Sequence, residues 1–373
     1  MLDNGQIQKA GDNSQLVQGN HIVIQNGIDE KRVREIFDEK TLELVEKFTV
    51  EAYDLIRERV KKFGEDLIPK LVKEGILEAL REPSVQILLR DAQMSAASTK
   101  RQSDYSLLSE LLIRRIKNGD NYYIKSGVSG AIKIVDEVSD EALLGLTVLY
   151  SVGYFVPFSQ GVLEGINILN HLFSSIVYDT LPEGVQWLEQ LDILKAVRFS
   201  SLFTLESCEN YYSRKLSGYI DVGIEKDSAD YDKALEIIQE VQLPQDILCD
   251  HELRRGYVRL KMINPNNIDS ISLCQSSPFL INSKSFTAEV VIKLSDEQKQ
   301  AIKRIYALYD TDSERRKENI TEFFRLWDNF EILKRVKTWW NNVPGASITP
   351  VGKSLAHANA QKYFPSLPEF YSE

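Results

Sequence analysis

The residues best suited to phosphate chemistry are Gly352, Lys353 and Ser354, which match the end of a Walker A loop. In such a loop, backbone N–H groups and the lysine hold the phosphates of a nucleotide. The first glycine of the motif would fall at position 347, but the chain has Ser347 there. Pro350 also removes a backbone N–H from the loop. The sequence therefore argues against a nucleotide site.

Two other stretches hold residue types that can bind a metal or act as a nucleophile. Cys249-Asp250-His251 holds two zinc-ligand types, but a structural zinc site needs four, and Cys208 and Cys274 are distant in sequence. Gly127-Val128-Ser129-Gly130 is no nucleophile elbow, because Ala131 stands where the second glycine is required. We expect no cofactor and no metal and assign no catalytic residue. The sequence favours a non-enzymatic protein, although distant residues that converge in a fold leave enzyme activity open.

A basic, aromatic stretch near the C-terminus could contact nucleic acid. Lys334, Arg335 and Lys337 lie beside Trp339 and Trp340, and basic side chains of this kind neutralise phosphates. The formal net charge of the chain is −10, however, which disfavours sequence-independent binding to DNA. We therefore favour a charged helix face with its tryptophans in the core, and nucleic acid is a disfavoured partner.

Helices would position any such site, but the N-terminal segment has a β-type pattern. Glycines at 11, 19 and 27 separate short apolar runs that are interleaved with glutamine and asparagine. So short a repeat cannot cover its own apolar side chains. It is predicted either to self-associate or to form a flexible polar tail. The residues predicted to mediate self-association are Gly11, Asn13, Gln15, Leu16, Gln18, Gly19, Asn20, Ile22, Ile24, Gln25 and Gly27.

The whole chain is predicted to be mainly α-helical, with four segments. These are the repeat (1–27), a helical-bundle body (28–214), a small mixed α/β insert or linker (215–293) and a C-terminal helical or winged-helix-like module (294–373). An amphipathic helix is expected from Glu30 to about Phe63, either packed on its own body or acting as a coiled-coil arm. Further helices are expected over 201–212 and 313–340.

An uncharged stretch from Leu143 to Leu163 is long enough to cross a bilayer. Pro157 and three glycines interrupt it, and its flanks carry acidic residues and no lysine or arginine. Two buried helices hinged near Pro157 are therefore expected. A segment that enters a membrane on activation is the alternative.

Several stretches together resemble an uncharacterised bacterial family suspected of a phage-defence or abortive-infection role. They are Lys9 to Ser14, Asp104 to Leu112, Gln186 to Asp192 and Ile348 to Ala360. The N-terminal Gly-Asp-Asn-Ser-Gln pattern is also similar to short oligomerisation motifs of bacterial immune signalling proteins. The resemblance implies a context and no catalytic residue.

The leading hypothesis is a self-associating sensor, adaptor or scaffold that forms a homo-oligomer and meets a protein partner of unknown identity. A membrane-active effector that uses 143–163 and a nucleic-acid-binding regulator that uses the C-terminal module are the alternatives. The N-terminus shows no secretory signal, and the three cysteines suggest no disulfide framework. A cytoplasmic location is expected.

Overall fold

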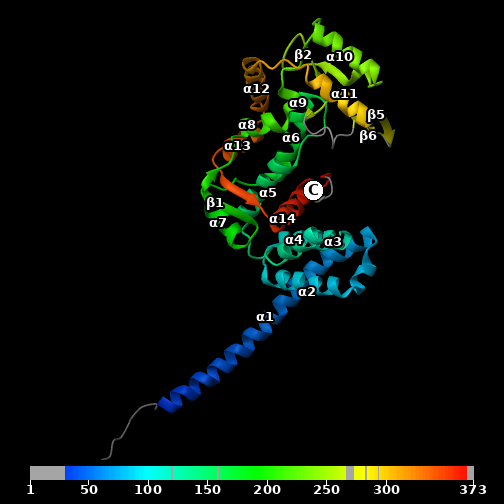
Figure 1. Ribbon diagram of the computed structural model, residues 1–373. Helices are drawn as coiled ribbons and strands as arrows, with labels where there is room; N and C mark the ends of the chain where they lie inside the picture. Colours follow the sequence, from blue (N-terminus) through cyan, green and yellow to red (C-terminus); the bar gives the residue numbers. More distant parts are fainter. Residues whose placement is uncertain are drawn as a thin grey trace, which may run out of the picture. The chain divides into compact units, whose positions relative to one another are not determined.

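The computed structural model describes residues 30–118, 121–157, 159–265, 273–281, 284–292 and 294–367. The β-type repeat and all its predicted contact residues lie outside these ranges. The described residues are mainly helical, with three small antiparallel sheets (Figure 1). This confirms the predicted fold class. The chain divides into two units, residues 1–58 and 59–373, which are described separately.

The first helix, α1 (Glu30–Glu74), is longer than predicted, because it continues through Gly64 and Pro69. Pro69 is exposed, so the backbone carbonyl that loses its helical hydrogen bond there can bind water. In the second unit, Phe63, Leu67 and Leu71 of this helix are at most 3% exposed. They anchor the end of α1 in the larger of two hydrophobic cores.

The larger core is built almost entirely from helices. The 3-10 helix η1 (Leu77–Arg81) follows α1. The remaining helices of this core are α2 (Pro83–Ser98), α3 (Gln102–Lys117), α4 (Tyr122–Ile132), α5 (Asp140–Tyr154), α6 (Val162–Ile176), α7 (Gln186–Ile193), α8 (Cys208–Lys215), α9 (Ser217–Ile220), α12 (Ser313–Trp327), α13 (Glu331–Trp340) and α14 (Pro350–Tyr363). Side-chain caps start several of them, as at Ser139, whose hydroxyl accepts from the Ala142 N–H.

The last helix, α14, is the central element of this core. It packs against α3, α4 and α5 (Figure 1), and its residues from Ser354 to Ala360 are all buried. Gly127 and Gly130 allow α4 to come close. A Cβ at Gly127 would lie 2.6 Å from the Pro350 carbonyl oxygen, and one at Gly130 would lie 2.6 Å from Val351. The small residues considered for a nucleophile elbow thus form a helix contact.

The smaller core contains most of the predicted mixed insert. It is formed by α10 (Ala229–Glu240), the 3-10 helix η2 (Gln245–Ile247), α11 (Asp296–Tyr306) and an antiparallel sheet of β2 (Ile224–Glu225), β4 (Tyr257–Leu260) and β3 (Leu248–Asp250), in that order. A separate antiparallel hairpin joins β5 (Leu273–Ile281) to β6 (Lys284–Ile292). A capping box formed by Ser295 and Gln298 starts α11.

The helix predicted over 201–212 is wrong. Strand β1 (Val197–Thr204) runs into this region, and α8 begins only at Cys208. The strand starts with alternating burial, since Val197 is buried and Arg198 exposed. It pairs antiparallel with β7 (Pro344–Ile348), which lies more than a hundred residues away. This distant partner is what turns an ambiguous apolar stretch into a strand.

The single helix predicted over 313–340 is also wrong, because α12 ends at Trp327 and α13 begins at Glu331. The C-terminal segment was predicted to be either helical or winged-helix-like. Its strand β7 pairs with β1 and with no second strand of the same segment, which favours the helical form.

The helices beyond the predicted boundary at 293 do not all belong to the same hydrophobic core. Helix α11 belongs to the smaller core, while α12, α13 and α14 belong to the larger. The four-segment division stays a prediction.

Replacing Gly352 by alanine should lower the free energy of unfolding by about 1–3 kcal/mol. A Cβ at this position would lie 2.0 Å from the Ala196 carbonyl oxygen, which also accepts from the Thr349 N–H. Gly153→Ala is the matched control, because no atom lies within 4 Å of its Cβ position in helix α5. Denaturant unfolding should show the loss for Gly352→Ala alone, and equal curves for the two variants would contradict the close contact.

Candidate functional site

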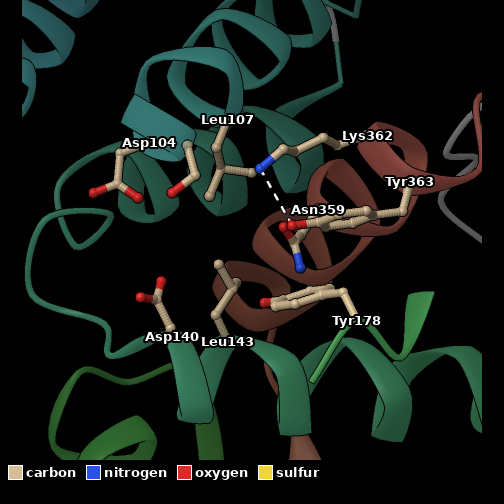
Figure 2. A pocket seen from close by; sticks show the side chains of 9 residues that line it. Asp104, Leu107, Asp140, Leu143, Tyr178, Asn359, Lys362 and Tyr363 are labelled. Atoms are coloured by element: carbon tan, nitrogen blue, oxygen red, sulfur yellow. Dashed lines mark hydrogen bonds between the residues drawn. The ribbon is translucent and has the colours of Figure 1, made fainter. Parts of the chain in front are cut away.

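A cavity of about 200 Å³ opens where four segments of the larger core meet. Helix α3, the first turns of α5, the chain after α6 and the end of α14 supply its walls (Figure 2). The residues that line it are Ser103, Asp104, Leu107, Asp140, Leu143, Tyr178, Asn359, Lys362 and Tyr363. They lie up to about 260 positions apart in the chain, so only the fold brings them together.

The acidic side of the cavity is formed by Asp104 and Asp140. Arg101 joins the two carboxylates: its Nε lies 3.0 Å from Asp104 Oδ2, and its Nη1 lies 3.0 Å from Asp140 Oδ1. Thr99 also donates to Asp104 Oδ2, at 2.6 Å. The other oxygen, Asp104 Oδ1, is buried without a hydrogen-bond partner among the described residues. An acceptor left in this state is costly unless a ligand or water donates to it.

Burial acts on the titration of this acidic group. The Asp104 side chain is 1% exposed. Desolvation raises the pKa of its carboxyl above the usual value, although the Thr99 hydroxyl and the Arg101 guanidinium act in the opposite direction. A cationic group near Oδ1 would stabilise the carboxylate and lower this pKa. Arg101, which pairs with both carboxylates, already supplies positive charge on this side of the cavity.

The opposite side of the cavity carries an ammonium and two phenols. The Lys362 Nζ donates to the Tyr363 hydroxyl at 3.4 Å (Figure 2). The rings of Tyr178 and Tyr363 stack with centroids 4.5 Å apart, and their hydroxyl ends point into the cavity (Figure 2). Burial lowers the pKa of Lys362 and raises the pKa of both tyrosines, which keeps the phenols protonated as donors.

No motif in the sequence marks this site. One local signal is the position of Asp104, three residues before Leu107 and four before Leu108, which places the carboxylate on the apolar face of a helix. A carboxylate on a buried face usually has a specific partner or role. Lys362 and Tyr363, at the end of another helix, carried no comparable signal.

The residues predicted to contact nucleic acid have protein partners in part. The Lys337 ammonium lies 2.6 Å from Asp328 and 4.0 Å from Glu209, and its side chain is 15% exposed. The Arg335 guanidinium donates to the Asp179 carbonyl oxygen, while Lys334 is exposed. Contact of these three with nucleic acid stays a prediction.

The neighbouring tryptophans belong to the core. Trp339 and Trp340 are 9% and 5% exposed. Their indole N–H groups donate at 2.8 Å to the carbonyl oxygens of Pro182 and Glu206. Neither ring is available for stacking on a base.

The remaining candidate stretches are structural in the described residues. Gly352-Lys353-Ser354 forms the first turn of α14 rather than a loop. Cys249 lies in β3, and the buried His251 ring hydrogen-bonds to backbone groups. Across the described part of the chain, no group of three histidine, cysteine or acidic side chains could hold a metal ion.

The apolar stretch 143–163 forms most of α5 and the first two residues of α6, with Pro157 between the two helices as predicted. Helix α6 is not buried on all sides, since Leu163 is 52% exposed. All residues of α5 from Ala142 to Val152 are buried, so their release would dismantle the larger core. In the described residues, no helix combines the length and the apolar character needed to span a bilayer.

Fold and cavity together define a mainly helical protein with two hydrophobic cores and a small, charge-separated pocket in the larger one. A protein-family model described only as "-like" matches residues 27–368. The match covers more than half of the chain, which therefore belongs to this family, in agreement with the predicted membership of an uncharacterised family. No curated protein matches the chain, and no solved structure matches it.

Proposed function

We propose that the protein is a cytoplasmic, non-enzymatic sensor, adaptor or scaffold that self-associates through residues 5–27 and the adjoining part of α1. The proposal rests mainly on the apolar side chains that α1 leaves exposed in the first unit. Val50, Tyr53 and Ile56, spaced three residues apart along one side of the helix, are 46–64% exposed. Exposed apolar patches of this kind are typical of interaction surfaces.

The position of this patch supports a homo-oligomer in particular. It lies on the helix that follows the glycine-rich repeat, whose apolar side chains also need cover. Identical chains that pair through the repeat would bring their α1 helices close together, where a coiled coil would bury both patches. The Gly-Asp-Asn-Ser-Gln pattern, similar to motifs of bacterial immune signalling proteins, favours a role in anti-phage defence.

Deletion of residues 1–27 should reduce the mass of the particle in solution from an oligomer to a monomer, as measured by light scattering. Tyr53→Asp in the full chain should weaken the assembly too, because the interface would bury an unpaired charge. Ile193→Asp is the matched control: Ile193 is 79% exposed on α7, away from α1 in the sequence. An unchanged mass after the deletion would remove the proposal.

A further inference from the structure

Among the described residues that line the cavity, Lys362 is the cation without a counterion. Its ammonium donates to the neutral Tyr363 hydroxyl at 3.4 Å, and no described carboxylate forms an ion pair with it. Asp104 and Asp140 line the same cavity, but both pair with the Arg101 guanidinium. Burial lowers the pKa of Lys362, although the two aspartates act in the opposite direction. Water therefore solvates this ammonium poorly, and an anionic ligand would stabilise it.

Two phenols complete the surroundings of this ammonium. The Tyr363 hydroxyl accepts from Lys362, so its own proton can be donated to a ligand. The Tyr178 and Tyr363 rings stack with centroids 4.5 Å apart, and both hydroxyl ends point into the cavity (Figure 2). Burial raises the pKa of both phenols, so both are donors at neutral pH. One ammonium and two phenolic protons are suitable donors for the oxygens of a carboxylate.

The rest of the cavity limits the charge of the ligand. Figure 2 shows Leu107 and Leu143 between the two aspartates and Lys362. The leucines separate a bound anion from the carboxylates of Asp104 and Asp140 and offer an apolar surface to its carbon atoms. One guanidinium pairs with both carboxylates, so negative charge remains on that side. A dianion would be repelled more strongly than a monoanion.

We propose that this cavity binds a small organic monocarboxylate. The ligand carboxylate accepts from the Lys362 ammonium and from the Tyr178 and Tyr363 hydroxyl groups, and its carbon chain or ring contacts Leu107 and Leu143. A cavity of about 150 Å³ accommodates benzene, so the volume of about 200 Å³ suits a ligand of roughly ten non-hydrogen atoms or fewer. The inference goes beyond self-association and does not depend on it.

Calorimetry on the full-length protein tests the class of ligand with butyrate, hexanoate and benzoate as probes. At least one of the three should bind. Its amide, which has the same shape without the charge, and inorganic phosphate should each bind at least about tenfold more weakly. Norleucine, which is hexanoate with an ammonium beside its carboxylate, should bind more weakly than hexanoate because it brings a second cation close to Lys362. Binding of none of the three carboxylates, or equal binding of the amide, of phosphate or of norleucine, would overturn the proposal.

Substitutions on the two sides of the cavity give a second test, with the carboxylate that binds best. Lys362→Gln should weaken its binding about tenfold or more, because it removes a charged donor, and Lys362→Arg should retain more of the affinity. Asp140→Asn should leave the affinity equal or raise it, because it removes negative charge from the cavity at an exposed position. Lys233→Gln, at an exposed pair with Asp230 on α10, is the matched control.

Tyr363→Phe keeps the ring and removes one donor, so it tests the site even if Lys362→Gln does not fold. It should weaken binding by about tenfold. Unchanged affinity in Lys362→Gln and Tyr363→Phe, or a tenfold loss in Asp140→Asn, would contradict the site. Particle mass, measured in parallel, reports separately on self-association.

Discussion

Replacement of Glu252 by alanine is expected to lower the free energy of unfolding by about 3–5 kcal/mol, the usual effect of stripping a buried charge of its partner. Arg259 is that charge. Its side chain is 1% exposed, and its Nη2 lies 2.7 Å from Glu252 Oε2. Without the carboxylate, the guanidinium would remain in the protein interior with backbone carbonyls and the Tyr219 ring as its only described partners.

Glu252 also holds the two cores together. Both of its carboxylate oxygens accept from the Val162 N–H, at 3.0 and 3.1 Å, at the start of helix α6 in the larger core. Arg259 lies on β4, whose neighbouring residues belong to the smaller core, and its guanidinium donates to the Gln160 carbonyl oxygen at 2.6 Å. One carboxylate thus caps a helix of one core and neutralises a strand residue of the other.

Three companion variants separate charge from packing in denaturant unfolding experiments. Glu252→Gln retains an acceptor and should cost less than Glu252→Ala. Glu252→Leu combined with Arg259→Met should recover part of the loss, because no buried charge remains. Glu322→Ala, at an exposed pair with Arg325, should change stability by less than about 1 kcal/mol. A loss for Glu252→Ala as small as this control would show that Arg259 is not held by its partner.

The sequence is sufficient to predict structure where the determining residues are close together in the chain. The side chains of Ser139, Ser295 and Thr349 cap helices, as these residue types commonly do, and Pro157 lies between α5 and α6 as predicted. The sequence pattern gave the wrong structure where an element depends on a partner far away in the chain, since β1 is a strand because it pairs with β7. It also failed at Gly127, whose small size serves a helix contact with Pro350 that no spacing rule indicates.

The pocket illustrates the same limit for function. Its acidic and basic groups come from opposite ends of the chain, and their significance depends on the charges they face across the cavity. Asp104 on an apolar helix face was the one local signal. The buried Arg259–Glu252 ion pair could not be predicted from the sequence either. An arginine in a stretch of alternating polarity is expected to face solvent.

A marked loss of stability on mild acidification is expected from two buried histidines. His251 accepts from the Leu253 N–H at Nδ1, 3.2 Å away, so the proton of its neutral ring is on Nε2, which donates to the Asp221 carbonyl oxygen at 2.8 Å. Protonation would set two N–H groups against each other at Nδ1. Burial, followed by the nearby Arg259 and Arg254, lowers the pKa of His251 to about 4.

The sign of the effect follows from proton binding in the two states. Between pH 6.5 and 4 the unfolded chain protonates this histidine and the folded chain does not, so stability falls as the pH falls. The loss is about 1.4 kcal/mol per pH unit and about 3 kcal/mol over the window. His357, buried beside Tyr150 with a pKa lowered to about 3, adds a similar slope over the whole of this range.

Urea unfolding at several pH values from 7 to 4.5 measures this slope, above the range in which most carboxyl groups titrate. His251→Gln should reduce the slope by about half, because one of the two titrating rings is gone. Val258→Ala, which truncates a buried side chain of the same core, is the control for destabilisation alone and should lower the whole curve without altering its slope. A wild-type slope near zero, or the same slope in both variants, would show that the His251 ring can accept a proton inside the fold.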